Sequence, residues 1–203
     1  MCEVKNETRS LLDVPSFHTE IVEKVIPQVK TIALKSGEPF VQKETYWLID
    51  KLKEVNPNCE VRFTTNGQYS FNDKIKSELK KIKVEKITFS IDSIYKDTFE
   101  KVRAGGNLTK LLKTIEDVKT WIKEEGLSDQ IELNANITLQ KDNWKDIPET
   151  FKYLFDNKIA PHIIIVEKPE QFSLSSLTDA EFVEVMTYYL NLGPEYGKHL
   201  NKL

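Results

Sequence analysis

Short extended runs alternate with helix-patterned segments along most of this chain. Apolar residues in the helical segments recur at helical spacing, whereas the extended runs are short, rich in β-branched residues and bounded by polar turns. The pattern predicts helices over residues 17–29, 42–55, 73–82, 95–102, 107–125, 146–157 and 178–190, and strands over 31–35, 60–65, 86–91, 131–139 and 162–166. A helix followed by five strand–helix repeats is typical of an α/β fold with a parallel sheet and right-handed crossovers.

Capping signals mark several of the helix ends. Asn107 is expected to cap the long helix that follows it. Asp146 with Glu149, and Thr178 with Glu181, each have the spacing of a capping pair. These signals predict where three of the helices begin.

The fifth predicted strand, 162–166, is wholly apolar. Strands of a parallel sheet that are buried on both faces have this composition, so we expect this strand to be buried. No composition change divides the chain. We therefore expect one domain over 1–203, with an irregular segment at 1–16 and a tail at 192–203.

Composition limits the class of protein. The 29 basic and 32 acidic side chains give a net charge of −3, which argues against a nucleic-acid partner. No apolar run approaches the ~18 residues of a membrane span, so we expect no membrane segment. No leader is recognised, and two cysteines, Cys2 and Cys59, are too few for a disulfide framework. These features predict a cytoplasmic protein.

Polar residues follow the strands where each predicted strand ends. They are Ser36-Gly37-Glu38-Pro39, Thr65-Asn66-Gly67, Ser90-Ile91-Asp92-Ser93, Asn134 with Asn136, and Glu167. Each turn alone is ordinary turn chemistry. Carboxyl ends of parallel strands lie at one edge of a sheet, where α/β proteins bind ligands, so the set predicts a ligand site. The sequence shows no histidine spacing for zinc, no phosphate loop and no nucleophile elbow.

Taken in order, these segments resemble the radical S-adenosylmethionine (SAM) superfamily, most closely its members with a cysteine-rich SPASM extension. The matching segments are SGEP at 36–39, TTNG at 64–67, SIDS at 90–93, YKDTFEKVRAGGNLTKLLKTIEDV at 95–118 and LNANITLQKDNWKDIP at 133–148. The resemblance covers about residues 17–170. It implies a partial parallel (β/α) barrel, similar to a TIM barrel, in which five strands are present and the first strand of the family is missing.

The resemblance also implies cofactors. A [4Fe–4S] cluster held by three cysteines binds SAM through its fourth iron, and one electron from a donor cleaves SAM to a 5′-deoxyadenosyl radical. That radical abstracts a hydrogen from the substrate, which makes such proteins oxidoreductases. The protein orients these groups and tunes the cluster. The substrate, a small molecule or a peptide, is not predicted.

The resemblance assigns expected roles to the residues at the strand ends. Ser36, Gly37, Glu38 and Pro39 would meet the methionine amino group, and Arg103 would pair with the SAM carboxylate. Ser90 and Asp92 are candidates for the ribose or methionine end, and either Asn134 or Asn136 for the ribose. Thr65 and Asn66 are expected to shape the rim rather than to bind ligand.

Cys2 fits the third cysteine of the C-x-x-x-C-x-x-C cluster loop. The other two cysteines, and the strand before them, would lie upstream of Met1, so we expect an N-terminally truncated chain. Cys59 is not expected to replace them, because it begins a strand at the opposite end from the rim.

Three hypotheses follow. The chain is part of a radical SAM enzyme, inactive as written, or it is a degenerate relative without a cluster that binds a ligand or partner. A third possibility is an unrelated barrel enzyme with an acid–base site on Glu38 and Asp92. An unpaired edge at 31–35 further predicts self-association.

Overall fold

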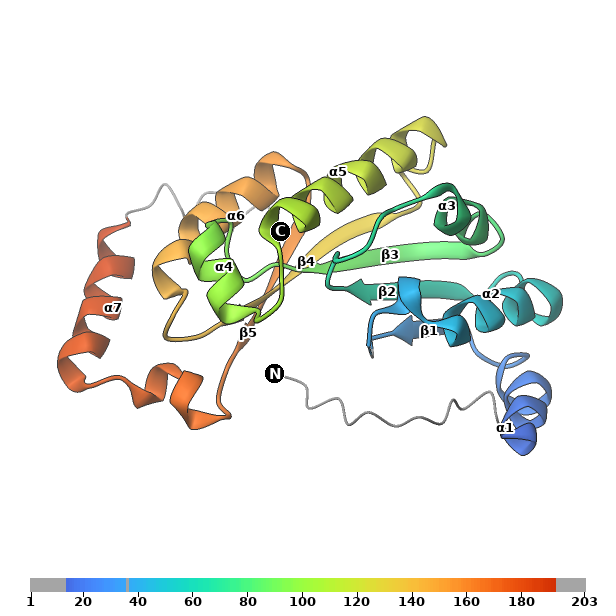
Figure 1. Ribbon diagram of the computed structural model, residues 1–203, viewed down its shortest axis with the longest axis horizontal. Coiled ribbons are helices and arrows are strands. Elements are labelled where there is room, and N and C mark those ends of the chain that lie inside the picture. Colours follow the sequence, from blue (N-terminus) through green and yellow to red (C-terminus); the bar gives the residue numbers. More distant parts are fainter. Residues whose placement is uncertain (1–13, 36, 193–203) are drawn as a thin grey trace. The chain divides into compact units, whose positions relative to one another are not determined.

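The computed structural model describes residues 14–35 and 37–192, in which helices alternate with strands (Figure 1). In chain order the α-helices are α1 Pro15–Glu20, α2 Lys43–Val55, α3 Asp73–Leu79, α4 Lys96–Val102, α5 Leu108–Glu124, α6 Ile147–Asp156 and α7 Asp179–Asn191. The strands are β1 Thr31–Leu34, β2 Glu60–Thr65, β3 Lys83–Ser90, β4 Glu132–Leu139 and β5 Ala160–Ile165. A π-helical turn, η2 Ile21–Val25, continues α1, and 3₁₀ turns lie at η3 Pro39–Val41, η4 Trp144–Asp146, η5 Glu170–Phe172 and η6 Leu174–Ser176.

The five strands form one parallel sheet in the order β1-β2-β3-β4-β5. Thr31 of β1 lies opposite Glu60 of β2, and Asn134 of β4 lies opposite Ala160 of β5. Strand order follows chain order, so helical crossovers join neighbouring strands. Among the described residues β1 and β5 are the two ends of the sheet, which does not close. The predicted α/β fold with a partial parallel barrel is therefore confirmed.

The chain divides into two compact units. The first comprises Met1–Thr88 with Lys113–Glu132, and the second comprises Phe89–Leu112 with Leu133–Leu203. The boundaries fall within β3, within α5 and at the start of β4, so the two units share these elements. The single domain expected from the sequence stays a prediction.

The core of the first unit is built from β2, β3 and the apolar stripes of its helices. Side chains of β2 alternate between buried and exposed positions, as a strand with one covered face requires. The fully or almost fully buried side chains include Ile49, Leu52, Val61, Phe63, Ile75, Leu79, Ile87, Ile115 and Val118. Asn107 Oδ1 accepts a hydrogen bond from Lys110 N–H at 2.8 Å, which confirms the predicted cap of α5.

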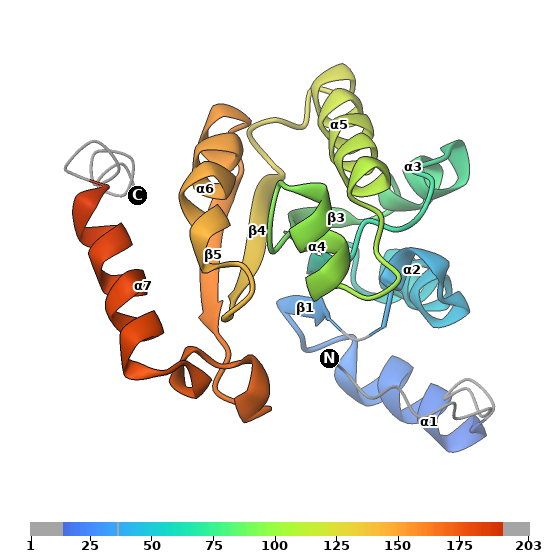
Figure 2. The ribbon, with the colours of Figure 1, turned by 60° about the vertical axis from the view of Figure 1, so that its left-hand side comes forward.

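In the second unit, α7 is the red helix at the left of Figure 2, and two of its tyrosines join it to the turn η4. Tyr188 donates a hydrogen bond to the Lys145 carbonyl at 2.9 Å, and Tyr189 donates one to the Trp144 carbonyl at 2.6 Å. Both tyrosine rings lie against the Trp144 ring. None of the helices in the part of the chain that the structure describes is long and apolar enough to cross a membrane.

Two local predictions are wrong. Asp146 makes no capping bond with its side chain, because its Oδ2 instead accepts a hydrogen bond from the Ser93 hydroxyl at 2.6 Å. The strand β5 is not buried, since Ile163, Ile164 and Ile165 are 37%, 44% and 61% exposed. Consecutive residues point to opposite faces of a strand, so both faces of β5 are open. The apolar composition of β5 reflects its strand propensity and not burial on both sides.

Candidate functional site

The carboxylate of Glu38 joins the carboxyl end of β1 to the carboxyl end of β2. Its Oε1 accepts a hydrogen bond from the Thr65 hydroxyl at 2.7 Å, and its Oε2 accepts one from the Asn66 N–H at 2.8 Å. A longer bond of 3.5 Å from the Phe40 N–H makes Glu38 the cap of η3. The predicted loops SGEP and TTNG thus meet within the first unit. Thr65 and Asn66 shape this edge, as predicted, by holding Glu38.

Glu38 lies in an apolar and aromatic environment. Burial raises the pKa of Glu38 above its ordinary value, because the lost hydration outweighs the hydrogen bonds from Thr65, Asn66 and Phe40. Tyr69 beside it is 5% exposed, and its ring lies 4.9 Å from that of Phe40. Burial, and then the negative charge of Glu38, raise the pKa of the Tyr69 phenol. Hydrogen bonds, rather than free hydration, therefore hold this carboxylate.

The backbone of SGEP reverses at Gly37, which has φ +65°. A Cβ atom there would also collide with the side-chain amide of Gln42. Pro39, which is buried, occupies the first position of η3, where its missing N–H costs nothing. Glycine and proline therefore serve the turn that presents Glu38. Ser36, the first residue of the predicted motif, lies outside the described residues.

Two helix residues that sequence reasoning missed hold these loops. The Thr114 hydroxyl of α5 lies 3.0 Å from the Gly67 carbonyl and 2.9 Å from the Tyr69 carbonyl. Tyr46 of α2 donates a hydrogen bond to the Phe40 carbonyl at 2.6 Å. Their roles depend on long-range partners. The one sequence signal was a threonine, Thr114, among the apolar positions of α5, and it is 2% exposed.

In the second unit, Asp92 is the centre of a separate polar cluster. It is 2% exposed, and its Oδ1 accepts a hydrogen bond from the Thr138 N–H at 2.6 Å. Its Oδ2 lies 2.8 Å from Arg103 Nε. Its backbone carbonyl accepts a bond from the Asn143 side-chain amide at 2.8 Å. The structure thus brings two of the predicted site residues, Asp92 and Arg103, into direct contact.

Arg103 lies at the end of α4, where its backbone makes two hydrogen bonds. The backbone N–H of Arg103 donates to the Phe99 carbonyl at 2.8 Å, and the Arg103 carbonyl accepts from the Gly106 N–H at 2.7 Å. A Cβ on Gly106 would lie 2.9 Å from that carbonyl, so only glycine fits without a shift. The Nε–H is not aligned for a hydrogen bond, so the contact with Asp92 is an ion pair. The Arg103 side chain is 26% exposed.

Asn134 and Asn136 share one face of β4, as predicted. Ala135 and Ile137 point to the other face and are fully buried. Asn134 Oδ1 is buried and has no hydrogen-bond partner in the described part of the chain. A buried amide oxygen without a donor is an unmet acceptor, and it fits a ligand that brings a hydroxyl group, such as the ribose of SAM. Ser90, at the end of β3, is half-buried.

The predicted cluster ligand, Cys2, lies outside the described residues. Cys59 is a free, buried thiol immediately before β2, and burial is the main cause of its raised pKa. The six residues of β2 place it about 20 Å from the edge where Thr65 lies. Within residues 14–35 and 37–192, no group of three or more His, Cys, Asp or Glu side chains could hold a metal ion.

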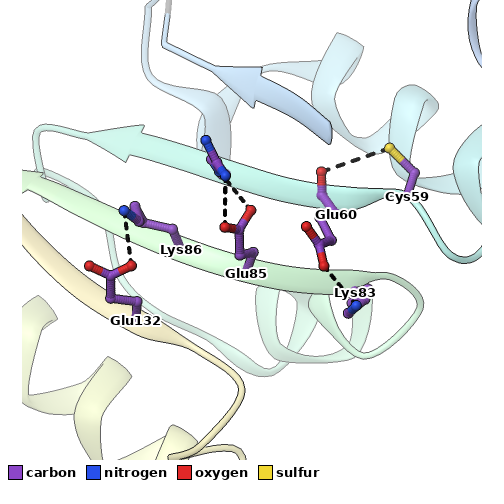
Figure 3. A network of polar contacts seen from close by, with 7 residues as sticks. Cys59, Glu60, Lys83, Glu85, Lys86 and Glu132 are labelled. Atoms are coloured by element: carbon purple, nitrogen blue, oxygen red, sulfur yellow. Dashed lines mark hydrogen bonds and ion pairs between the residues drawn. The ribbon is translucent and has the colours of Figure 1, made fainter. Parts of the chain in front are cut away.

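Charged residues on β2, β3 and the start of β4 form a ladder of ion pairs in the first unit (Figure 3), which sequence reasoning also missed. The pairs are Arg62 with Glu85 at 2.6 Å, Lys83 with Glu60 at 2.7 Å, and Lys86 with Glu132 at 2.9 Å. The first pair is bidentate, and its hydrogen bonds raise the pKa of Arg62 and lower that of Glu85. Exposed pairs of this kind stabilise a fold only weakly, so we assign the ladder no role in ligand binding.

Comparison with known proteins identifies the family. A family model described as the radical SAM superfamily matches residues 6–154. The GTP 3′,8-cyclase of Sinorhizobium medicae is 30% identical over 148 residues, which are 71% of this chain and 40% of the cyclase. The GTP 3′,8-cyclase of Clostridium perfringens strain SM101 is 26% identical over 160 residues, which are 78% of this chain and 46% of that enzyme. The chain spans less than half the length of these curated relatives.

Solved structures share the fold. The crystal structure of Streptococcus suis SuiB has a TM-score of 0.53 and 14% sequence identity, and the match covers 80% of this chain and 36% of SuiB. SuiB bound to its precursor peptide SuiA also has a TM-score of 0.53, with 16% identity over 80% of this chain and 35% of SuiB. Identities this low show a common fold alone. Together with the family match over most of its length, they lead to one conclusion: the chain belongs to the radical SAM superfamily.

Proposed function

We propose that this chain forms the part of a radical SAM enzyme that binds SAM. The observation that carries the proposal is the buried Asn134 Oδ1, which has no hydrogen-bond donor among the described residues. Burying an unmet polar atom destabilises a protein by about 1–3 kcal/mol, so such atoms are found where a ligand completes the hydrogen bonding. Asn134 lies on the open face of β4 with Asn136, away from the buried face.

Within the second unit we assign the polar groups of SAM to four residues. Asn134 Oδ1 accepts a hydrogen bond from a ribose hydroxyl, with Ser90 and Asn136 as further polar contacts. The guanidinium of Arg103 binds the methionine carboxylate, for which a planar guanidinium is the natural partner. Asp92 acts through Arg103 as a positioning residue, because its two oxygens are already engaged by Thr138 and Arg103.

Within the first unit we propose the SGEP turn as a binding site for an ammonium group. The carboxylate oxygens of Glu38 already accept hydrogen bonds from Thr65 and Asn66. Backbone carbonyls of the turn, which Gly37 and Pro39 hold in place, are then the acceptors that remain for an ammonium group. The hydrogen bonds of Glu38 hold the turn in one conformation. The backbone carbonyls then lose little conformational entropy when they bind an ammonium group, which favours binding.

The cluster, when bound, supplies the electron that cleaves SAM and so starts hydrogen abstraction. Cys2 is the residue of this sequence that we propose as a cluster ligand, and Cys59 is too far from the edge to join it. Family membership removes the hypothesis of an unrelated barrel enzyme. Asp92 and Glu38 are in any case poor acid–base candidates, because both carboxylates are held by internal partners.

The substrate is left open. The relatives named GTP 3′,8-cyclase match this chain over less than half of their length, so their substrate does not transfer to it. The peptide of SuiB belongs to a protein that shares the fold at 16% identity. We therefore propose a small-molecule or peptide substrate without naming one.

The test compares SAM binding and stability in two variants. The chain is reconstituted anaerobically with iron and sulfide, and SAM binding is measured by equilibrium dialysis. Asn134→Leu should weaken SAM binding about 10-fold, the value of one lost hydrogen bond. The same change should leave the free energy of unfolding unchanged or raise it, because it removes an unmet polar atom. The control Glu132→Gln, two positions before Asn134 at the start of β4, breaks an exposed ion pair with Lys86 and should bind SAM within about 2-fold of the wild type.

Two results separate the hypotheses. A wild-type chain that binds no SAM, or an Asn134→Leu variant that binds SAM unchanged, contradicts the proposal. Absorption near ~400 nm after reconstitution indicates a ligated cluster, as the enzyme hypothesis requires. SAM binding without that absorption instead supports a degenerate relative that binds ligand but has no cluster.

A further inference from the structure

The strand β5, in the second unit, lies at one end of the sheet and has exposed apolar side chains. Ile163, Ile164 and Ile165 are 37%, 44% and 61% exposed, and no described strand pairs with the far side of β5. Exposed edge strands usually carry a charge, a bulge or an internal proline that prevents pairing with another chain. From 159 to 166 the chain has no charged residue, and its one proline, Pro161, lies near the beginning of the strand. The segment 162–165 is therefore unprotected.

The helix α7 of the same unit also carries exposed apolar side chains. In both views α7 lies beyond β5, on the side away from β4 (Figures 1 and 2). Its exposed apolar side chains are Phe182 at 45%, Val183 at 62%, Met186 at 47% and Leu190 at 77%. Three of these recur every four residues and so form a stripe along the helix. A different side of α7 faces the protein. It carries the buried Val185 and the two tyrosines, Tyr188 and Tyr189, that hydrogen-bond to η4.

We propose that a second copy of the chain pairs with β5, so that the two copies form a two-fold symmetric dimer with antiparallel β5 strands. The proposal is independent of SAM binding. A symmetric interface brings the same surface of both copies together, so each residue must be compatible with its own partner. An uncharged strand meets this condition, whereas a charged strand would place like charges opposite each other.

The sequence of β5 suits pairing with itself. If the two-fold axis passes between Ile163 and Ile164, each Ile163 lies opposite Ile164 of the other copy, and each His162 lies opposite Ile165. Cross-strand pairs of β-branched side chains are favourable in sheets. Pro161, which has no N–H to donate, then falls outside the paired segment opposite Val166.

Exposed apolar side chains are numerous in this unit. Seven of them, on β5 and α7, are between 37% and 77% exposed. The small net charge of −3 adds little repulsion between copies. The sequence had predicted self-association at the edge of β1 instead. There, only Ala33 is exposed, so β1 offers far less apolar surface than β5.

Sedimentation velocity at about 1–100 μM protein tests the proposal. Protein–protein interfaces of standard size bind in the micromolar range or tighter. The wild type should be dimeric at the upper concentrations. Ile164→Lys should raise the dissociation constant at least 10-fold, because it places an ammonium group in the apolar interface. Ala33→Lys, on the exposed position of β1, should leave the dimer unchanged, and circular dichroism should show that both variants are folded.

Hydrogen exchange of the wild type supplies a second measurement that needs no variant. Amides of 162–166 should become more protected as the protein concentration rises, while amides of β1 should not change. A wild type that is monomeric at 100 μM overturns the proposal, as does a dimer that Ala33→Lys dissociates and Ile164→Lys does not. Protection of 162–166 that is independent of concentration also overturns it, because another segment or partner then covers this edge.

Discussion

At the scale of single residues, polar groups near the strand ends are of two kinds. Glu38 and Asp92 have both carboxylate oxygens engaged by protein donors, so they organise the loops around them. Asn134 Oδ1 has no such partner among the described residues, and the Arg103 side chain is 26% exposed. A group whose hydrogen bonds are already made gains little from a ligand, whereas an unmet buried group gains the most. This difference separates positioning residues from candidate binding residues.

Replacing Glu38 should change how stability depends on pH. Burial raises the folded-state pKa of Glu38 above its ordinary value of 4.5, so the native state holds this proton more tightly than the unfolded state. Its contribution to stability is complete below pH 4.5 and is lost as the pH rises through the folded-state pKa. In urea titrations, the free energy of unfolding of the wild type minus that of Glu38→Gln should therefore fall between pH 4 and pH 7.

Glu85 provides a control of opposite sign. The hydrogen bonds from Arg62 lower its folded-state pKa, so its contribution to stability is present above pH 4.5 and is lost on acidification. The corresponding difference for Glu85→Gln should rise with pH. If both differences changed in the same direction, the assignment of burial as the main cause at Glu38 would be wrong.

Removing the charge of Asp92 should destabilise the second unit. Asp92→Asn leaves the Arg103 guanidinium, 26% exposed, without its counter-charge. Fully buried pairs cost about 3–5 kcal/mol when one partner is removed, so partial exposure reduces the expected loss to about 2–3 kcal/mol. The control Asp142→Asn, which breaks the exposed pair with Lys101, should cost less than about 1 kcal/mol. Equal losses in chemical denaturation would show that the Asp92 pair contributes no more than a surface pair.

At the scale of elements, local and distant partners compete for the same capping side chain. Thr178 and Glu181 bond to each other across the first turn of α7, as the sequence predicts. Asp146 has the same opportunity at α6, but its carboxylate accepts from Ser93 instead. At Asp146 the Ser93 hydroxyl, rather than an N–H of the first helical turn, is the donor to the side-chain carboxylate. The α6 helix begins without this cap because η4 leads into it and Pro148 occupies its first turn.

Thr178→Ala should therefore weaken α7 measurably. The change removes the hydroxyl that accepts from the Glu181 N–H, and lost N-caps cost about 1 kcal/mol. Urea unfolding followed by circular dichroism measures the loss. Glu184→Gln, which breaks the exposed ion pair between α7 and Lys145 of η4, should cost less than about 0.5 kcal/mol. Two variants of equal stability would indicate that the capping box does not stabilise the helix.

At the scale of the whole molecule, the open sheet has two very different ends. β1 keeps three of its four side chains partly covered, whereas β5 exposes three consecutive isoleucines. Composition alone does not distinguish these ends, since both strands are apolar. The position of each strand in the sheet, and the helices beside it, decide which edge is available for another chain.

Binding of SAM should also be visible as a change in global stability. A ligand that binds the native state alone at 100 times its dissociation constant raises the free energy of unfolding by about 2.7 kcal/mol. The anaerobically reconstituted chain should show this increase in urea titrations with saturating SAM. Asn134→Leu should show a smaller increase at the same SAM concentration, because its dissociation constant is larger. An increase of the same size in both would place the SAM site away from Asn134.

The amino-acid sequence alone determined the order of the elements and the class of fold. Hydrophobic periodicity and capping pairs such as Thr178–Glu181 act over a few residues, so the chain need not be folded for them to be read. The sequence also placed polar loops at the carboxyl ends of the strands, and the family match confirmed the resemblance drawn from those loops.

Tertiary structure decided which of those polar residues are already satisfied. The partners of Glu38 are 27 and 28 positions away, Ser93 and Asp146 are 53 apart, and the Asp92–Thr138 bond spans 46. Such pairs depend on which strands become neighbours, and many other pairings have the same local pattern. The exposure of β5 also depends on which elements become its neighbours in the folded chain. Burial is a property of what surrounds a segment, and only the folded chain supplies the surroundings.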